Sequence, residues 1–280
     1  MATNLLTTDS NYTASPQMSS EAREMDRIIA GSLEAYIARS KEEVAASQRL
    51  RYRVFVEEMG AKASPEMHAA KIDIDEFDDL CDHLLIVDNA HNNKVVGSYR
   101  LLRRSKLPAG RRFYTEGEYD ISKTLSHFKG EVMELGRSCV DKEYRNRSTI
   151  QLLWRAIGDY TGTHNVKMLF GCASFPGSDH KLHAKQLAYL YHYHLAPEQF
   201  RARALENLYT SMNLYKKEEL DAKEILSSLP PLIKGYLRLG GYIGDGAFED
   251  IGYNTTDVCI ILDTANITDK YLNRYGSKIE

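Results

Sequence analysis

The order of apolar and polar positions along the chain predicts a mixed sheet with helices between its strands. Residues 33–39 have the pattern of a strand, and Ser40 with Glu43 forms a capping box that starts a helix expected to run to about Met59. Five further strands are predicted at 83–87, 94–103, 131–140, 167–173 and 255–262. Two further helices are predicted at 150–157 and 230–239. No G-x-G-x-x-G follows the first strand, so we expect a compact α/β fold with flanking helices, not a doubly wound one.

Two segments depart from this regular pattern. Residues 1–32 are polar and rich in Ser, Thr and Asn, which predicts a loosely ordered N-terminal arm with a short helix around 22–29. Residues 176–228 are rich in Tyr and Leu and longer than an ordinary connection, so we expect a helical insertion there. The remaining chain, 33–280, then forms one domain that contains this insertion.

Composition and charge exclude several classes of protein. The formal net charge of −3 lacks the strong positive field of a nucleic-acid binder, so we expect no nucleic-acid partner. The four cysteines are far apart and the nine histidines have no metal-binding spacing, which predicts free thiols and no metal site. Apolar runs fall short of the roughly 18 residues of a membrane span. We therefore expect a cytoplasmic protein, at most peripheral to a membrane.

The turn at 141–148 carries the first candidate chemistry. Arg145, Arg147 and Ser148 lie between a strand end and a helix start, where free N–H groups and the helix dipole favour a phosphate. The alternative interpretation is a solvated turn. Val140 and Arg145 fit the V-x-P-x-x-R-x-x-G-x-G pattern, so the chain resembles the Gcn5-related N-acyltransferase (GNAT) superfamily. Ser148 and Ile150 stand where this pattern has its two glycines. In this respect the chain resembles the branch of the superfamily that takes acyl groups from acyl carrier protein.

Seven residues strengthen this resemblance, because they match acyl-homoserine lactone synthases and related N-acyl amino acid synthases in order and spacing. They are Arg51, Phe55, Asp75, Asp78, Arg100, Glu134 and Arg137. An ion pair between Asp75 and Arg51 or Arg100 is the structural alternative to a substrate role. From about Leu50 to its end the chain most resembles the bacterial ornithine lipid synthases, the L-ornithine N-alpha-acyltransferases.

The resemblance implies a GNAT-like fold and a reaction. A 3-hydroxyacyl chain would move from the phosphopantetheine of acyl carrier protein to the α-amine of L-ornithine, giving lyso-ornithine lipid as the first step of ornithine lipid biosynthesis. No permanently bound cofactor is implied. Two alternatives stay open: an N-acyl amino acid or homoserine lactone synthase that uses another amine, and a carrier-binding or membrane-binding module without catalysis.

Site roles follow from the same resemblance. Glu134 is the expected general base because burial in an apolar strand would raise its pKa, and an ion pair with Arg137 is the alternative. Strict alternation places these two residues on opposite faces, so both can line one cavity only if the strand has a bulge near Gly136. The resemblance also implies that the donor pairs with backbone at Ser138, Cys139 and Val140.

The remaining candidates are a thiol, two histidines and a basic run. Cys139 has no adjacent His, so we interpret it as a packing residue and not as a nucleophile. His180 could assist proton transfer, and His183 is considered with it, but surface positions on the insertion are the alternative. Acidic carrier proteins would dock on a basic run, with a solvated loop or contact with anionic lipid as the alternatives. That run comprises Arg103, Arg104, Lys106, Arg111 and Arg112.

Overall fold

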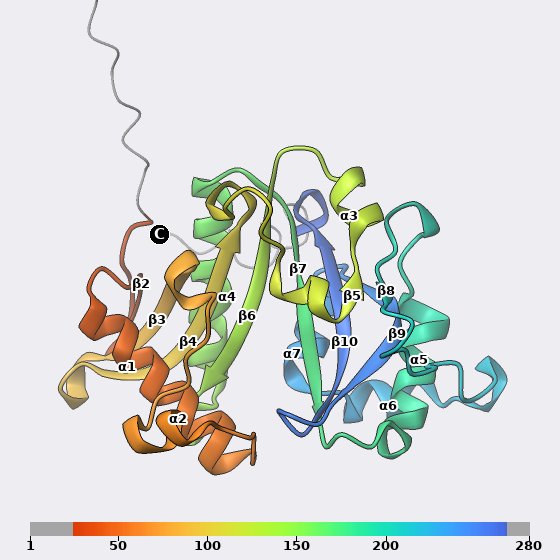
Figure 1. The fold of residues 1–280 in the computed structure, drawn as a ribbon, viewed down its shortest axis with the longest axis horizontal. Helices are drawn as coiled ribbons and strands as arrows, with labels where there is room; N and C mark the ends of the chain where they lie inside the picture. Colours follow the sequence, from red (N-terminus) through yellow and green to blue (C-terminus); the bar gives the residue numbers. More distant parts are fainter. Residues whose placement is uncertain (1–24, 268–280) are drawn as a thin grey trace, which may run out of the picture.

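One sheet organises residues 25–267, which are the residues that this computed structural model describes (Figure 1). Within them ten strands have the order β1-β2-β3-β4-β6-β7-β10-β9-β8-β5. Their bounds are β1 Ile28–Ala30, β2 Leu33–Ile37, β3 Asp82–Asp88, β4 Lys94–Arg103, β5 Tyr119–Asp120, β6 Glu131–Val140, β7 Val166–Pro176, β8 Arg203–Ala204, β9 Tyr242–Asp250 and β10 Thr255–Asp263. Neighbours are antiparallel except the β6–β7 and β8–β9 pairs, so the predicted mixed sheet is confirmed.

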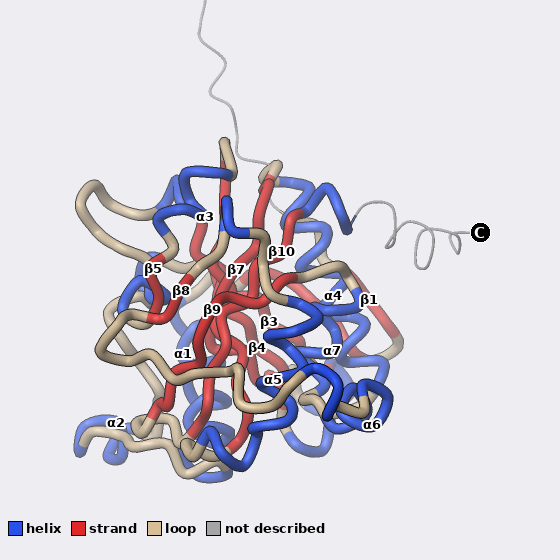
Figure 2. The backbone as a smooth tube through the Cα atoms, turned by 90° about the vertical axis from the view of Figure 1, so that its right-hand side faces the viewer, coloured by secondary structure: helices blue, strands red, loops and turns tan. Residues whose placement is uncertain are grey.

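Helices cover both faces of the sheet (Figure 2). Their bounds are α1 Lys41–Arg51, α2 Pro65–Ala70, α3 Ser122–His127, α4 Arg147–Thr163, α5 Ala184–His194, α6 Ala222–Ser228 and α7 Pro231–Arg238. Helices α4, α5, α6 and α7 share the largest core cluster with one face of the strands. On the other face, Leu50 of α1 packs with Leu85 of β3, while Val132 of β6 lies in a separate cluster with Phe170 of β7.

Local signals in the sequence explain how several elements begin and end. The predicted capping box is confirmed, because the Ser40 hydroxyl accepts from the Glu43 N–H at 3.2 Å and the Glu43 carboxylate accepts from the Ser40 N–H. Helix α1 continues as a π-helical segment, Tyr52–Glu58, and the chain then turns at Gly60 with φ +78°. The predicted strands at 83–87, 94–103, 131–140, 167–173 and 255–262 are also confirmed.

Residues 25–29, the described part of the short helix expected around 22–29, are not helical. Residues 1–24 lie outside the described residues, but Ile28–Ala30 is strand β1, which pairs with β2 through Ile28 opposite Ala35. Gly31, with φ +64°, makes the two-residue turn between the strands possible. The strand has three residues, of which only Ile28 is buried, so the sequence holds no alternating apolar pattern long enough to predict it.

The expected helical insertion at 176–228 is helical only in part. Helices α5 and α6 are present, while the chain between them is largely irregular and contributes the short strand β8. Its apolar side chains join the main core, including Leu187, Met212, Leu220 and Ile225. The segment therefore packs as part of the domain core.

Candidate active site

Strands β6 and β7 pair over a short distance and then diverge. Their parallel register runs from Glu131 to Glu134 on β6, and Phe170 of β7 is the last partner. At the next position Gly171 lies so close to β6 that an added Cβ would be 2.2 Å from the Leu135 carbonyl oxygen. Beyond this point, within residues 25–267, the β7-facing edge of β6 has no strand partner.

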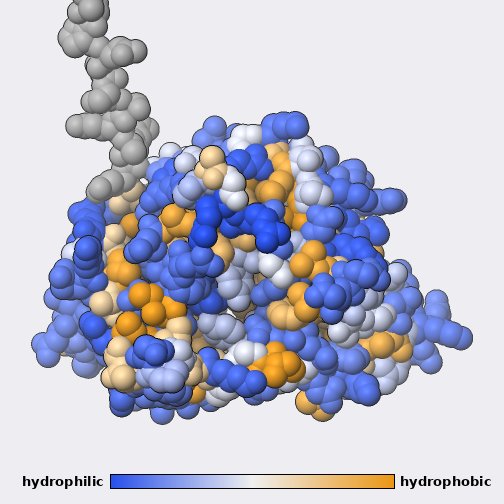
Figure 3. All heavy atoms as spheres, viewed as in Figure 1, coloured by the Kyte–Doolittle hydropathy of each residue, from blue (hydrophilic) through white to orange (hydrophobic). Residues whose placement is uncertain are grey.

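A cavity of about 610 Å³ lies in this divergence. Its wall includes residues 134–140 of β6 and 172–174 of β7, together with parts of β10, α4 and the π-helical segment. In the space-filling view the molecule is hollowed between the two halves of the sheet (Figure 3). The volume of the cavity falls in the range of about 300 to 1,000 Å³ that is typical of small-molecule sites.

The predicted bulge in β6 is confirmed. Ser98 of β4 lies opposite Cys139 and Arg100 lies opposite Gly136, so β6 has one additional residue between these two pairs. Arg137 has φ +52°, a left-handed backbone conformation that is uncommon for a residue with a side chain. As a result, Arg137 and Glu134 line the same cavity.

Glu134 is 5% exposed, and its carboxylate holds a backbone turn. Its oxygens accept from the Tyr114 N–H at 3.1 Å and the Thr115 N–H at 2.6 Å. Burial raises the pKa of Glu134, and the hydrogen bonds from Thr115 and Tyr114 oppose this rise. Among the described residues no ion pair joins Glu134 to Arg137; the carboxylate is anchored by backbone instead.

Three arginines and three aspartates form a buried network beside the cavity. Its contacts are Arg51–Asp73 at 2.7 Å, Arg51–Asp78 at 2.6 Å, Arg100–Asp75 at 2.5 Å and Arg137–Asp75 at 2.9 Å. The ion-pair alternative for Asp75 with Arg100 is therefore what the structure contains, while Arg51 pairs with Asp73 and Asp78. Asp73 was not predicted from the sequence, although it lies two residues before Asp75 in an acidic stretch.

Aromatic rings cover the arginine of the bulge. The Arg137 guanidinium lies 4.8 Å from the centroid of the Tyr114 ring and 4.6 Å from that of Tyr253. Phe55 makes an edge-to-face contact with Tyr253 at 5.8 Å and lines the cavity. Such cation–π contacts stabilise a guanidinium that burial would otherwise disfavour.

The predicted donor-binding residues separate into two groups. Ser138, Cys139, Val140 and Arg145 line the cavity, whereas Arg147 and Ser148 lie at the exposed start of α4, outside its wall. Arg145 donates from Nε to the Val140 carbonyl at 3.0 Å and from Nη2 to the Glu58 carboxylate at 2.7 Å. Its charge is therefore already partnered.

Other candidates have environments that fit structural roles. Cys139 is 5% exposed and packs in the α1 cluster, and burial raises the pKa of its thiol to about 12, so it is not a thiolate near neutral pH. His180 Nδ1 lies 2.7 Å from the Glu249 carboxylate, and His183 Nε2 lies 2.9 Å from the Pro176 carbonyl oxygen. Neither histidine lines the cavity.

Much of the basic run is engaged with neighbouring groups. Arg103 and Lys106 both pair with Asp82, and Arg111 pairs with Glu76 at 2.6 Å. Arg104 donates to two backbone carbonyls, and Arg112 is exposed. The run is thus less cationic than the sequence suggests.

A second group of acidic residues was not predicted from the sequence. Asp257 of β10 and Glu118 are each 6% exposed, and the Cys172 thiol donates to Glu118 at 2.9 Å. Burial, with repulsion between the two carboxylates among the further causes, raises the pKa of Glu118 to about 8; burial also raises that of Asp257 to about 6. A lone Asp within the apolar stretch TTDVCIIL was the available signal.

Comparisons with known proteins assign the family. A family model described as an acetyltransferase (GNAT) domain matches residues 50–155. The L-ornithine N(alpha)-acyltransferase of Agrobacterium fabrum is 43% identical over 255 residues, which cover 89% of this chain and 87% of the relative. The protein of the same name from Rhizobium meliloti is 44% identical over 251 residues, covering 88% of this chain and 85% of the relative.

The chain belongs to the L-ornithine N(alpha)-acyltransferase family. The solved structure of FeeM, an N-acyl amino acid synthase from uncultured soil microbes, matches with a TM-score of 0.50 at 9% identity, over 88% of this chain and 98% of that chain. This likeness supports the fold alone. The predicted GNAT-like fold and the predicted family are both confirmed. In the described part of this acyltransferase, none of the helices combines the length and apolar character that crossing a membrane requires.

Proposed function

We propose that this acyltransferase transfers a 3-hydroxyacyl group from the phosphopantetheine of acyl carrier protein to the α-amine of L-ornithine. The observation that carries the proposal is the cavity at the divergence of β6 and β7, with the buried carboxylate of Glu134 in its wall. Membership of the L-ornithine N(alpha)-acyltransferase family supports ornithine as the acceptor.

The reaction requires that an amine attack a thioester carbonyl. The α-ammonium of the acceptor first loses a proton, the new C–N bond forms, and the C–S bond breaks to release the thiol of the donor. Glu134 accepts the proton, because a buried carboxylate of raised pKa is a better base than an exposed one. The attacking nitrogen loses a second proton as the amide forms, and the leaving thiolate takes up that proton, while the first passes from Glu134 to solvent.

The developing oxyanion needs a hydrogen-bond donor. The edge of β6 from Gly136 to Val140 faces the cavity and has no strand partner on that side within the described residues. Pairing with β4 on its other edge holds β6 rigid, so the N–H groups on the unpaired edge can stabilise the oxyanion without reorganisation. The same edge supplies hydrogen bonds for the pantetheine chain.

Donor recognition is assigned to two surfaces. Arg145 and Arg147 flank the start of α4 and receive the pantetheine phosphate, with Ser148 beside them. The carrier protein docks on the basic run of residues 103–112, where Arg112 is exposed. Because the product is an amphipathic lipid, we place the enzyme in the cytoplasm, peripheral to the membrane that receives this product.

Reconstitution with purified components tests the proposal. The chain is incubated with 3-hydroxyacyl carrier protein and one amino acid at a time; released thiol is measured and the product is identified by mass spectrometry. We expect N-acylornithine in stoichiometric amount with released thiol. An acylated amine other than ornithine would indicate another synthase, and carrier binding without thiol release from any amine would indicate a non-catalytic module.

A further inference from the structure

Charge pairing around the cavity is unequal. The cations of its wall are already partnered: Arg100 and Arg137 by Asp75, and Arg145 by Glu58. Three carboxylates of the wall have no ion-pair partner among the described residues, and these are Glu134, Asp250 and Asp257. The cavity thus has an excess of negative charge that a cationic ligand would balance.

Asp257 has one carboxylate oxygen, Oδ1, that no donor in the described part of the chain satisfies. Glu134 accepts two backbone N–H groups, and Asp250 accepts from the N–H groups of Gly252 and Tyr253 at 2.7 and 2.9 Å. Asp257 Oδ1 is buried and makes no hydrogen bond within the described part of the chain. A buried carboxylate oxygen without a donor destabilises a fold, so it needs a ligand or a function to explain it.

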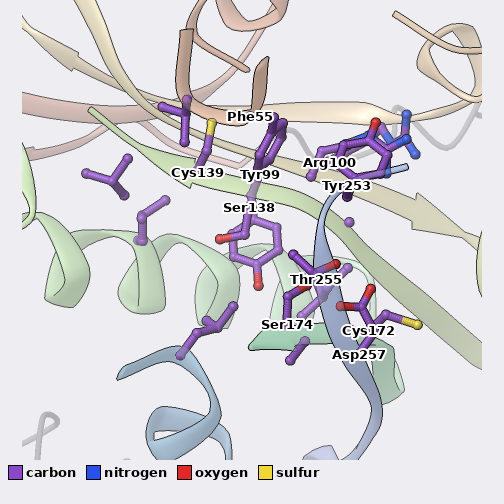
Figure 4. Close-up of a pocket in the computed structure, with 18 of the residues that line it drawn as sticks. Phe55, Tyr99, Arg100, Ser138, Cys139, Cys172, Ser174, Tyr253, Thr255 and Asp257 are labelled. Atoms are coloured by element: carbon purple, nitrogen blue, oxygen red, sulfur yellow. The ribbon is translucent and has the colours of Figure 1, made fainter. Parts of the chain in front are cut away.

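Charged neighbours act on Asp257 in both directions, because Asp250 raises its pKa and Arg137 lowers it. In the close-up Asp257 lies beside Cys172 and near Ser174 and Thr255, while Arg100 and Tyr253 lie on the opposite side of the pocket (Figure 4). The Ser174 and Thr255 hydroxyls moderate the pKa of Asp257, but neither is placed to donate to Oδ1. Glu118 lies behind the Cys172 thiol.

We propose that Asp257 binds the side-chain ammonium of the acceptor amino acid and so selects a cationic acceptor over a neutral one of the same length. This inference rests on the proposed function, which places the acceptor in this cavity. An incoming ammonium group satisfies Oδ1 and stabilises the ionised carboxylate. A neutral side chain leaves the same carboxylate buried and unpaired, which is the arrangement that gives strong discrimination.

Acceptor specificity of the Asp257→Asn variant tests this proposal. L-Ornithine is compared with L-norvaline, which has the same carbon skeleton without the terminal amine, at one fixed acyl carrier donor. For the unmodified chain we expect kcat/KM for ornithine to exceed that for norvaline at least 100-fold. In Asp257→Asn we expect ornithine to lose about 100-fold or more, while norvaline changes less than threefold.

Matched controls separate this role from a loss of fold. Asp263→Asn alters the far end of the same strand, outside the cavity wall, and is expected to keep the ornithine preference. Turnover of norvaline reports whether the Asp257→Asn variant is folded. If that variant does not fold, Asp257→Ser, which also removes the charge, is tested in its place.

Each result has one meaning. An unmodified chain that acylates ornithine and norvaline equally well overturns the inference but leaves the transferase activity standing. A neutral variant at position 257 that retains the ornithine preference overturns it as well. If the unmodified chain acylates neither amino acid, the proposed function itself fails, and the inference fails with it.

Discussion

Replacing Glu118 with glutamine should stabilise the protein at alkaline pH. The carboxylate is 6% exposed, has no ion-pair partner among the described residues, and accepts from the Cys172 thiol at 2.9 Å. Burial, together with repulsion from Asp257, raises its pKa to about 8 from an ordinary 4.5. Glutamine keeps the shape and the acceptor oxygen of the side chain but cannot ionise.

The direction in which stability changes with pH follows from proton binding. Because the folded-state pKa is raised, the folded protein holds more protons than the unfolded chain between about pH 4.5 and 8, so stability falls as pH rises through this window. The two pKa values differ by about 3.5, which at about 1.36 kcal/mol for each pKa unit gives a maximum loss of about 5 kcal/mol.

Urea unfolding followed by circular dichroism at pH 5, 7 and 9 measures this loss. We expect the free energies of unfolding of the unmodified chain and Glu118→Gln to be similar at pH 5. At pH 9 the variant should be the more stable by about 3 to 5 kcal/mol. Glu218→Gln removes an exposed carboxylate and serves as the control, with no change expected. A difference between Glu118→Gln and the unmodified chain that stays constant from pH 5 to 9 would refute the reasoning.

Three further predictions concern the transfer itself. Glu134→Gln should lower kcat by about 100-fold or more in a thiol-release assay, as for loss of a general base, and near-normal rates across pH would exclude that role. Since Ser148 and Ile150 replace two glycines that admit a coenzyme A pyrophosphate, acyl carrier protein should give a higher kcat/KM than acyl coenzyme A of equal chain; equal values would contradict this. Arg145→Ala combined with Arg147→Ala should raise KM for the acylated carrier, through a loss of about 1.5 to 3 kcal/mol for a hydrogen bond to a charged group, and leave KM for the amine unchanged. If steady-state kinetics show no change and only the melting temperature falls, the Arg145–Glu58 ion pair is structural.

Elements with a strong local signal could be predicted from the sequence. The capping box at Ser40 and the β-rich apolar stretches of β3, β4, β6 and β10 depend on neighbouring residues, so they are visible without a fold. Strand β9 was missed because its Gly-rich start resembles a loop. The glycines serve packing there: an added Cβ at Gly246 would lie 2.5 Å from the Tyr209 ring, and this contact is invisible locally.

The candidate site was predictable where a motif covers it. The spacing of Arg51, Asp78 and Arg100 placed them in one cluster, and the conflict between Glu134 and Arg137 predicted the bulge. Their partners could not be assigned, because a charge pattern does not say which carboxylate lies within 3 Å of which guanidinium.

The sequence by itself determined the local elements, the family and the residue types that the chemistry needs, since each depends on short stretches of chain. Only the tertiary structure decided where β6 and β7 diverge, which cations are neutralised, and that Asp257 Oδ1 is buried at a cavity without a hydrogen-bond donor. The physical reason is that burial and charge pairing arise between residues far apart in the chain. Glu118 and Asp257 acquire their raised pKa values only when folding excludes water from both, and folding also brings Asp257 close enough to raise the pKa of Glu118 further.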